Sequence, residues 1–120
     1  MDIKAPWLNF YGDVPKTLEY PDCSMADLVY KAAQDYPDNI AYDFMGDKSS
    51  YKRFVSEIET CARAFWTLGI KSGQRVAICL PNLPQGITCF YALNKIGAIP
   101  NMIHPLSSAG EIKSYISMSE

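Results

Sequence analysis

The second half of the chain carries a strand–helix–strand pattern that strongly limits its possible folds. Residues 76–80 are consecutive apolar residues, which is typical of a strand buried on both faces inside a helix-covered sheet. A largely apolar helix follows through Ile96 and ends at Gly97, and residues 99–104 form another strand, which Pro100 restricts to a strand start or a sheet edge. Such a βαβ unit crosses over right-handed and pairs its strands in parallel, so the pattern predicts the α/β class.

Two amphipathic helices are predicted before this unit. Ser24 and Asp27 form a variant of the capping box, which opens a helix that Pro37 ends. Ser50 is a good N-cap for the clearest helix of the chain, whose apolar stripe between residues 51 and 66 recurs at helical spacing. Gly69 is placed to end this helix just past its C-cap.

A short hairpin and a last helix complete the predicted elements. Residues 40–45 and 48–50 indicate two short strands around the turn formers Gly46 and Asp47. Ser108 and Glu111 form a regular capping box, so a final helix is predicted after them.

The two ends of the chain suggest a larger parent protein. Residues 1–22 are rich in Pro and aromatic residues, so we expect an extended arm that lies on another surface. Residues 23–120 are expected to be a partial α/β domain, truncated at its C-terminus, because two interior strands are a poor platform for four amphipathic helices. The remainder of its own chain is then the main partner, and the bare apolar surface promotes self-association.

Charge and cysteine content exclude several classes of protein. The net charge of −2 argues against a non-specific nucleic-acid binder, which needs a concentrated basic surface. No apolar run approaches the ~20 residues of a transmembrane helix, and no secretory signal is visible at the N-terminus. The four cysteines form no CxxC pair, so we expect reduced structural thiols in a cytoplasmic protein and no metal site.

Two residues lie where an open α/β sheet usually binds ligands, at the carboxyl ends of its strands. His104 is either a partly buried histidine bonded to a nearby backbone group or a direct ligand contact, and Asn82 is either an N-cap or part of a binding crevice. The glycines never cluster into a phosphate loop, and no GxSxG elbow is present. Tyr42 and Asp43 indicate a solvated face, so the residues alone assign no catalytic, cofactor-binding or metal-binding position.

Six short segments nevertheless form an ordered set. They are P-D-x-x-A at 37–41, S-Y-x-x-F at 50–54, G-I-x-x-G-Q-x-V-A-I at 69–78, L-P-N at 80–82, L-x-K-x-G-A at 93–98, and N-x-x-H-P-L at 101–106, with Glu111 in the helix that follows. In this order they resemble the opening part of the adenylate-forming enzymes, the superfamily of acyl-CoA synthetases, luciferases and peptide-synthetase adenylation domains. Gln74 departs from the family, which usually has Asp there. The match runs from about Cys23 to Glu120.

The resemblance implies a parent enzyme that activates a carboxylic acid with ATP and Mg²⁺ to an acyl-adenylate and passes the acyl group to coenzyme A. The opening residues and the stretch 101–106 look more like fatty-acyl-CoA ligases than peptide-synthetase modules. The family's phosphate loop, nucleotide contacts, hinge and catalytic lysine lie beyond residue 120, so none is carried onto this chain, and the chain alone is expected to be inactive.

Two other functions remain open at this point. The first is a self-standing, non-catalytic binding or interaction module of the same α/β fold. The second is a small flavodoxin-like nucleotide binder, although the sequence has no phosphate loop for it.

Overall fold

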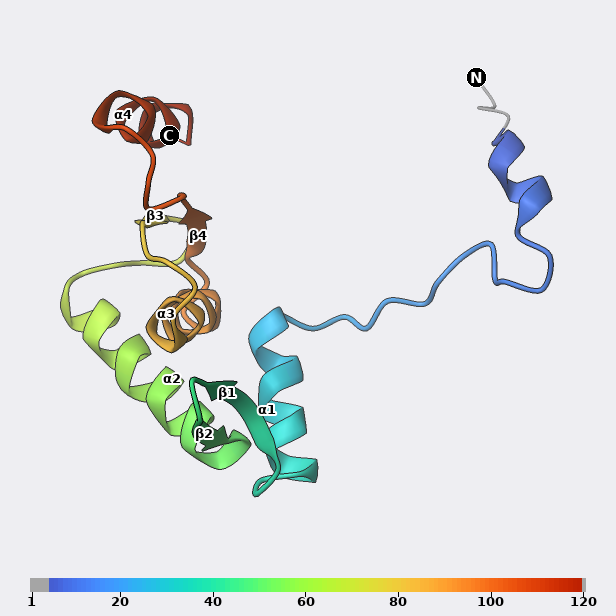
Figure 1. The fold of residues 1–120 in the computed structure, drawn as a ribbon, viewed down its shortest axis with the longest axis horizontal. Coiled ribbons are helices and arrows are strands. Elements are labelled where there is room, and N and C mark those ends of the chain that lie inside the picture. Colours follow the sequence, from blue (N-terminus) through green and yellow to red (C-terminus); the bar gives the residue numbers. More distant parts are fainter. Residues whose placement is uncertain (1–4, 120) are drawn as a thin grey trace.

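A computed structural model describes residues 5–119 of the chain (Figure 1). Predictions that fall on residues 1–4 and 120 lie outside this part. The elements in chain order are a 3₁₀ helix η1 (Pro6–Phe10), α1 (Met25–Asp35), β1 (Ile40–Phe44), β2 (Asp47–Ser50), α2 (Tyr51–Thr67), β3 (Arg75–Ile78), α3 (Pro84–Lys95), β4 (Ile99–Met102) and α4 (Ala109–Met118).

The βαβ unit is confirmed, with β3 and β4 paired in parallel from Arg75 opposite Ile99 to Ile78 opposite Met102. Both strands are shorter than predicted, since they end at residues 78 and 102 rather than 80 and 104. One further hydrogen bond extends the pairing at the carboxyl end, where the Ile103 N–H donates to the Ile78 carbonyl at 2.9 Å. Beyond this hydrogen bond the segments after β3 and β4 separate into loops. Both loops contain prolines, which have no N–H to continue the hydrogen bonding between the strands.

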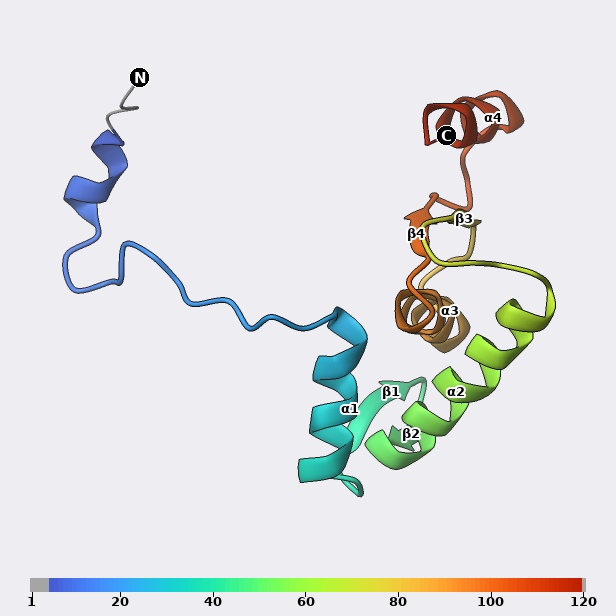
Figure 2. The same ribbon diagram turned by 180° about the vertical axis from the view of Figure 1, so that it is seen from behind.

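The parallel pair is covered unequally on its two sides. Helix α3 packs against both strands, whereas α4 lies on the opposite side and contributes no buried residue (Figures 1 and 2). Ile78 is buried, but its neighbours Ala77 and Cys79 are exposed. Within the described residues, β3 is therefore buried on one face only, although its sequence predicted burial on both.

Three helix starts follow the predicted capping chemistry. The Asp27 N–H donates to Ser24 Oγ, and the Asp27 carboxylate accepts from the Ser24 N–H at 2.8 Å, which makes a complete capping box. Ser108 and Glu111 repeat this arrangement at α4, and Ser50 caps α2. These side chains accept from backbone N–H groups that have no partner inside the helix.

The predicted role of Asn82 as an N-cap is wrong. Helix α3 begins at Pro84, Leu83 occupies the N-cap position, and no side chain caps the helix. Proline is favoured at the first helical position because its φ angle is already helical and its missing N–H has no intrahelical partner there. Pro84 therefore sets the helix start, and Asn82 lies one residue too early to cap it.

The hairpin and α2 form the other half of the fold. Strands β1 and β2 pair antiparallel around a tight turn in which Met45 and Gly46 both have positive φ. This matches a type I′ turn, whose twist fits that of the strands. Along α2, one face is buried against α1 and α3; the core at this junction consists of Val29, Phe54, Ile58, Ala62 and Ala92.

The N-terminal segment extends away from these elements (Figures 1 and 2). Its large side chains are open to solvent: Phe10 is 87% exposed and Tyr20 is 82% exposed. The surface on which we expected the arm to lie is thus not provided by the described part of this chain. Among residues 5–119, no helix has both the length and the apolar character needed to cross a membrane.

Gly97 makes the closest backbone approach around the βαβ unit. Its φ is +77°, its carbonyl accepts from the Gly73 N–H at 2.8 Å, and a Cβ added to it would lie 2.5 Å from Ser72 Oγ. Only glycine meets both requirements, because the left-handed conformation and the contact each disfavour a side chain.

We predict that Gly97→Ala lowers the free energy of unfolding by about 2–4 kcal/mol, through backbone strain plus the clash with Ser72. Gly73→Ala is the matched control, because its φ is +81° and its added Cβ would meet nothing within 4 Å. It should cost only about 1–2 kcal/mol. Urea titrations of both variants check this, and equal losses would show that the Ser72 contact has no effect.

Candidate functional site

The carboxyl ends of β3 and β4 bring two sequence-predicted positions to one edge of the sheet. The loop that contains Asn82 leaves β3 there, and His104 follows β4 two residues after its last paired residue. The Cys79 thiol contacts the His104 carbonyl at 3.9 Å, so the two departing segments start side by side.

His104 bonds to a nearby backbone group, as one of the two interpretations predicted. Its Nδ1 accepts a hydrogen bond from the Leu106 N–H at 3.2 Å. The residue is exposed rather than partly buried, because α4 does not close over it. It also lines a surface hollow of about 430 Å³ between β4 and α4, together with Asn101, Ser107 and Tyr115.

Asn82 borders a different and smaller hollow. That hollow has about 160 Å³ and is also lined by Tyr42 of the hairpin, by Leu83 just before α3 and by Ile87 of α3. The structure therefore places both residues at the edge of the sheet that the sequence indicated, but it does not combine them in one site.

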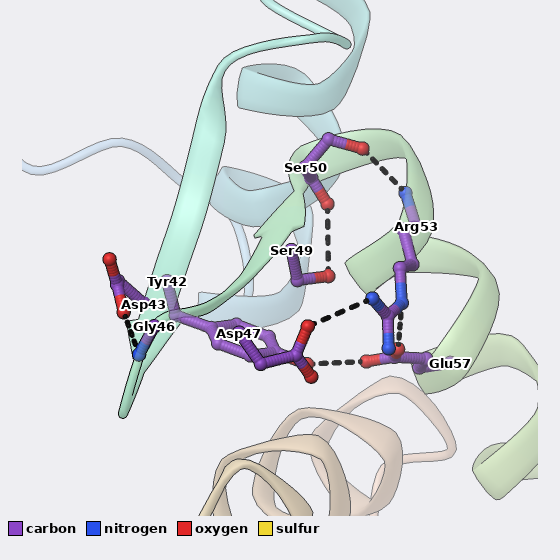
Figure 3. Close-up of polar contacts among 8 residues, drawn as sticks. All are labelled: Tyr42, Asp43, Gly46, Asp47, Ser49, Ser50, Arg53 and Glu57. Carbon is purple, nitrogen blue, oxygen red and sulfur yellow. Dashed lines mark hydrogen bonds and ion pairs between the residues drawn. The ribbon is translucent and has the colours of Figure 1, made fainter.

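A third hollow, of about 520 Å³, lies between the hairpin, α2 and α3, and a polar network forms part of its wall (Figure 3). Glu57 is the centre of this network, because its Oε2 accepts from the Tyr42 hydroxyl and its Oε1 from Arg53 Nε, each at 2.9 Å. Arg53 also lies 3.6 Å from Asp47. The sequence predicted a solvated face at Tyr42 and a turn at Asp47, and the only local signal for the network was the i,i+4 spacing of Arg53 and Glu57.

The electrostatics of this network favour a structural role over acid–base chemistry. Hydrogen bonding to Glu57, followed by the charge of Asp47, raises the pKa of Arg53. Burial is the main cause of the raised pKa of Tyr42. The two Glu57 carboxylate oxygens accept from side chains of β1 and α2, so the network ties the hairpin to the helix.

The described residues do not fit the groups that the family resemblance implies. Among residues 5–119, no cluster of three or more His, Cys, Asp or Glu side chains is placed to hold a metal ion. The glycines are dispersed along the sequence and form no glycine-rich phosphate-loop motif. No step with ATP, Mg²⁺ or coenzyme A is therefore derived from these residues.

Comparison with known proteins decides the family. Residues 29–120 match the family model described as AMP-binding enzyme. The chain belongs to this family. It is 29% identical over 114 residues to a long-chain-fatty-acid–CoA ligase of Bacillus subtilis, and 32% identical over 125 residues to one of Salmonella typhimurium. These alignments cover 94% and 98% of the chain but only 20% and 21% of the relatives, so the chain spans about a fifth of their length.

Solved structures agree with the fold. The N-terminal domain of FACL13 from Mycobacterium tuberculosis superimposes with a TM-score of 0.77 at 26% identity, over 81% of this chain and 25% of that one. The fused adenylation–PCP di-domain NpsA-ThdA from Klebsiella oxytoca gives a TM-score of 0.80 at 24% identity, over 83% of this chain and 19% of that one. The α/β fold, with its hairpin, parallel pair and four α-helices, is thus that of the N-terminal part of AMP-binding enzymes.

The family-like segment 93–98 has a structural role in this chain. Lys95 Nζ lies 2.7 Å from Glu59 Oε1 and 4.4 Å from the centre of the Tyr30 ring, and Tyr30 donates to the same carboxylate. The neighbouring Asn94 Oδ1 accepts from the Ala26 N–H at 2.9 Å. These contacts join α1, α2 and α3 at one point.

We predict that Glu59 makes stability depend on pH. The hydrogen bonds from Lys95 and Tyr30 hold the pKa of Glu59 below its ordinary value of 4.5. A lowered folded-state pKa gives a contribution that is complete above pH 4.5 and is lost as the pH falls through the folded value.

Glu59→Gln should therefore lower the urea midpoint at pH 7 by the equivalent of up to about 1 kcal/mol, as expected for a partly exposed ion pair. The difference from the unmodified chain should shrink as the pH falls below 4.5. Glu19→Gln, on the exposed arm, is the control. A difference that stays constant from pH 7 to pH 3 would contradict this role.

Proposed function

We propose that this chain is the N-terminal portion of an ATP-dependent acyl-CoA ligase that activates a fatty acid as an acyl-adenylate and transfers the acyl group to coenzyme A. The observation that carries the proposal is the similarity of nearly the whole chain to long-chain-fatty-acid–CoA ligases. A second group of relatives, crotonobetaine/carnitine–CoA ligases, is 45% identical over 53 residues, or 44% of the chain. Both groups of relatives are named as CoA ligases but differ in the acid they use. The comparisons therefore support the reaction class better than the identity of the acid substrate.

In this proposal the chain provides scaffold and the remainder of the same polypeptide provides the active site. The polar networks of the described residues are satisfied among themselves, and no metal-binding cluster is found in residues 5–119. One face of the β3–β4 pair is open: Ala77 on β3 and Ile99 on β4 lie on the face away from α3, and Ile99 is 47% exposed. Further strands and helices of a large domain would cover such a surface.

The remaining expectations belong to the same proposal. Residues 1–22 act as the N-terminal arm and residues 23–120 as part of the large domain. ATP and Mg²⁺ serve acid activation, since the metal and cationic groups stabilise the charge that develops on phosphate. The fatty acid, ATP, Mg²⁺ and coenzyme A are bound outside this chain, in the cytoplasm, where free thiols such as its four cysteines persist.

The chain alone should show no ATP–pyrophosphate exchange with any fatty acid, because the phosphate-binding and catalytic groups of the family are expected beyond residue 120. A chimera tests its role in a ligase: residues 23–119 replace the aligned segment of the Bacillus subtilis long-chain-fatty-acid–CoA ligase. Retained fatty-acyl-CoA formation supports a ligase scaffold. Exchange by the chain alone, or a folded chimera without activity, would favour the alternative of a self-standing module or a different enzyme.

The open apolar face should also make the isolated chain associate with itself. The exposed side chains of Ala77 and Ile99 lie on this face, and large apolar patches are uncommon on soluble monomers. Light scattering of the isolated chain should show a mass that rises with concentration, and Ile99→Lys should reduce the effect. A monomer at all concentrations would contradict the proposed open face.

A further inference from the structure

Two of the four cysteines lie against each other across the interface between α2 and α3. Cys61 Sγ on α2 is 3.8 Å from Cys89 Sγ on α3, although the residues are 28 positions apart in sequence. Both are free thiols and both are half-buried, whereas Cys23 and Cys79 are exposed. The sequence predicted separate structural thiols and gave no sign that these two meet.

The pair is open to small molecules from one side. Both cysteines line the hollow of about 520 Å³ whose wall also includes Leu83, Gln85 and Thr88. A volume of this size admits a molecule as small as a peroxide without movement of the helices. The two thiols are thus close enough to react with each other and accessible enough to be oxidised.

We propose that Cys61 and Cys89 form a peroxide-sensitive dithiol that closes into a disulfide between α2 and α3. One thiol is oxidised by hydrogen peroxide to a sulfenic acid, with release of one water. The second thiol then attacks that sulfur, the S–S bond forms, and the sulfenic oxygen leaves as a second water. In total, the two thiols lose two protons and two electrons, and one peroxide is reduced to two waters.

The geometry requires only a small rearrangement for this step. The sulfurs must approach by about 2 Å to reach the bond length of a disulfide, a distance within the range of rotation about the Cα–Cβ bonds. Burial, with a further contribution from Cys89, raises the pKa of Cys61 to about 12. Because the thiolate is the reactive form of cysteine, this raised pKa makes closure slow at neutral pH.

Closure would link two helices that already form the centre of the fold. The new bond encloses the segment between residues 61 and 89, which contains β3. Cross-linking a loop of this length restricts the unfolded chain and so raises the melting temperature. The reaction does not depend on the proposed ligase function, and a thiol reductant reverses it.

The test is disulfide mapping of the complete protein after treatment with hydrogen peroxide under native conditions. Trypsin places Cys61 in peptide 54–63 and places Cys79 and Cys89 together in peptide 76–95. We expect these two peptides to be linked, with a mass two hydrogens below their sum, and to separate again with dithiothreitol. The link should form in Cys79→Ser and Cys23→Ser, and it should be absent from Cys61→Ser and Cys89→Ser.

Each alternative result overturns the proposal. A link that is lost in Cys79→Ser but kept in Cys89→Ser would assign the reactive partner to the exposed Cys79. Peptides 54–63 and 76–95 that remain unlinked while Cys23 is oxidised would show that the pair is inert. If a serine variant fails to fold, fragment ions of the linked peptides from the unsubstituted protein show whether Cys79 or Cys89 carries the link.

Discussion

The packing of α2 on α3 is the interaction on which the rest of the structure depends. Ile58 on α2 and Ala92 on α3 are completely buried at this contact, where removal of apolar surface from water and close packing both stabilise the fold. Helix α1 and the hairpin pack on one side of the pair, and the parallel strands pack against α3 on the other. Loss of this contact would leave two small sheets that are each too small to be stable alone.

Polar residues around this core also hold the helices and the hairpin together. Lys95, Glu59 and Tyr30 tie three helices together, and Glu57 holds the hairpin side chain of Tyr42 to α2. Among the described residues, no buried side-chain nitrogen or oxygen lacks a partner. Groups engaged in this way have little capacity left for substrate, which supports a scaffold role for this part of an AMP-binding enzyme.

Local chemistry made much of the fold predictable. The helix starts at Ser24, Ser50 and Ser108 depend on contacts three residues apart, so the sequence alone locates them. The parallel pairing followed from one helix joining two strands. The N-cap at Asn82 failed because Pro84 competed for the same boundary, and the burial of His104 failed because it depends on whether α4 closes over the sheet edge.

The sequence by itself determined the order of the elements, the caps of α1, α2 and α4, the α/β class and the family, because these depend on neighbouring residues and on the spacing of short motifs. Only the tertiary structure brought Cys61 to Cys89, Glu59 to Lys95, and Ser72 to Gly97. These partners are more than 20 residues apart, and their meeting depends on how α2, α3 and the turn before β3 are arranged in space. No periodicity along a single element encodes such an arrangement, since it arises from the packing of whole elements against one another.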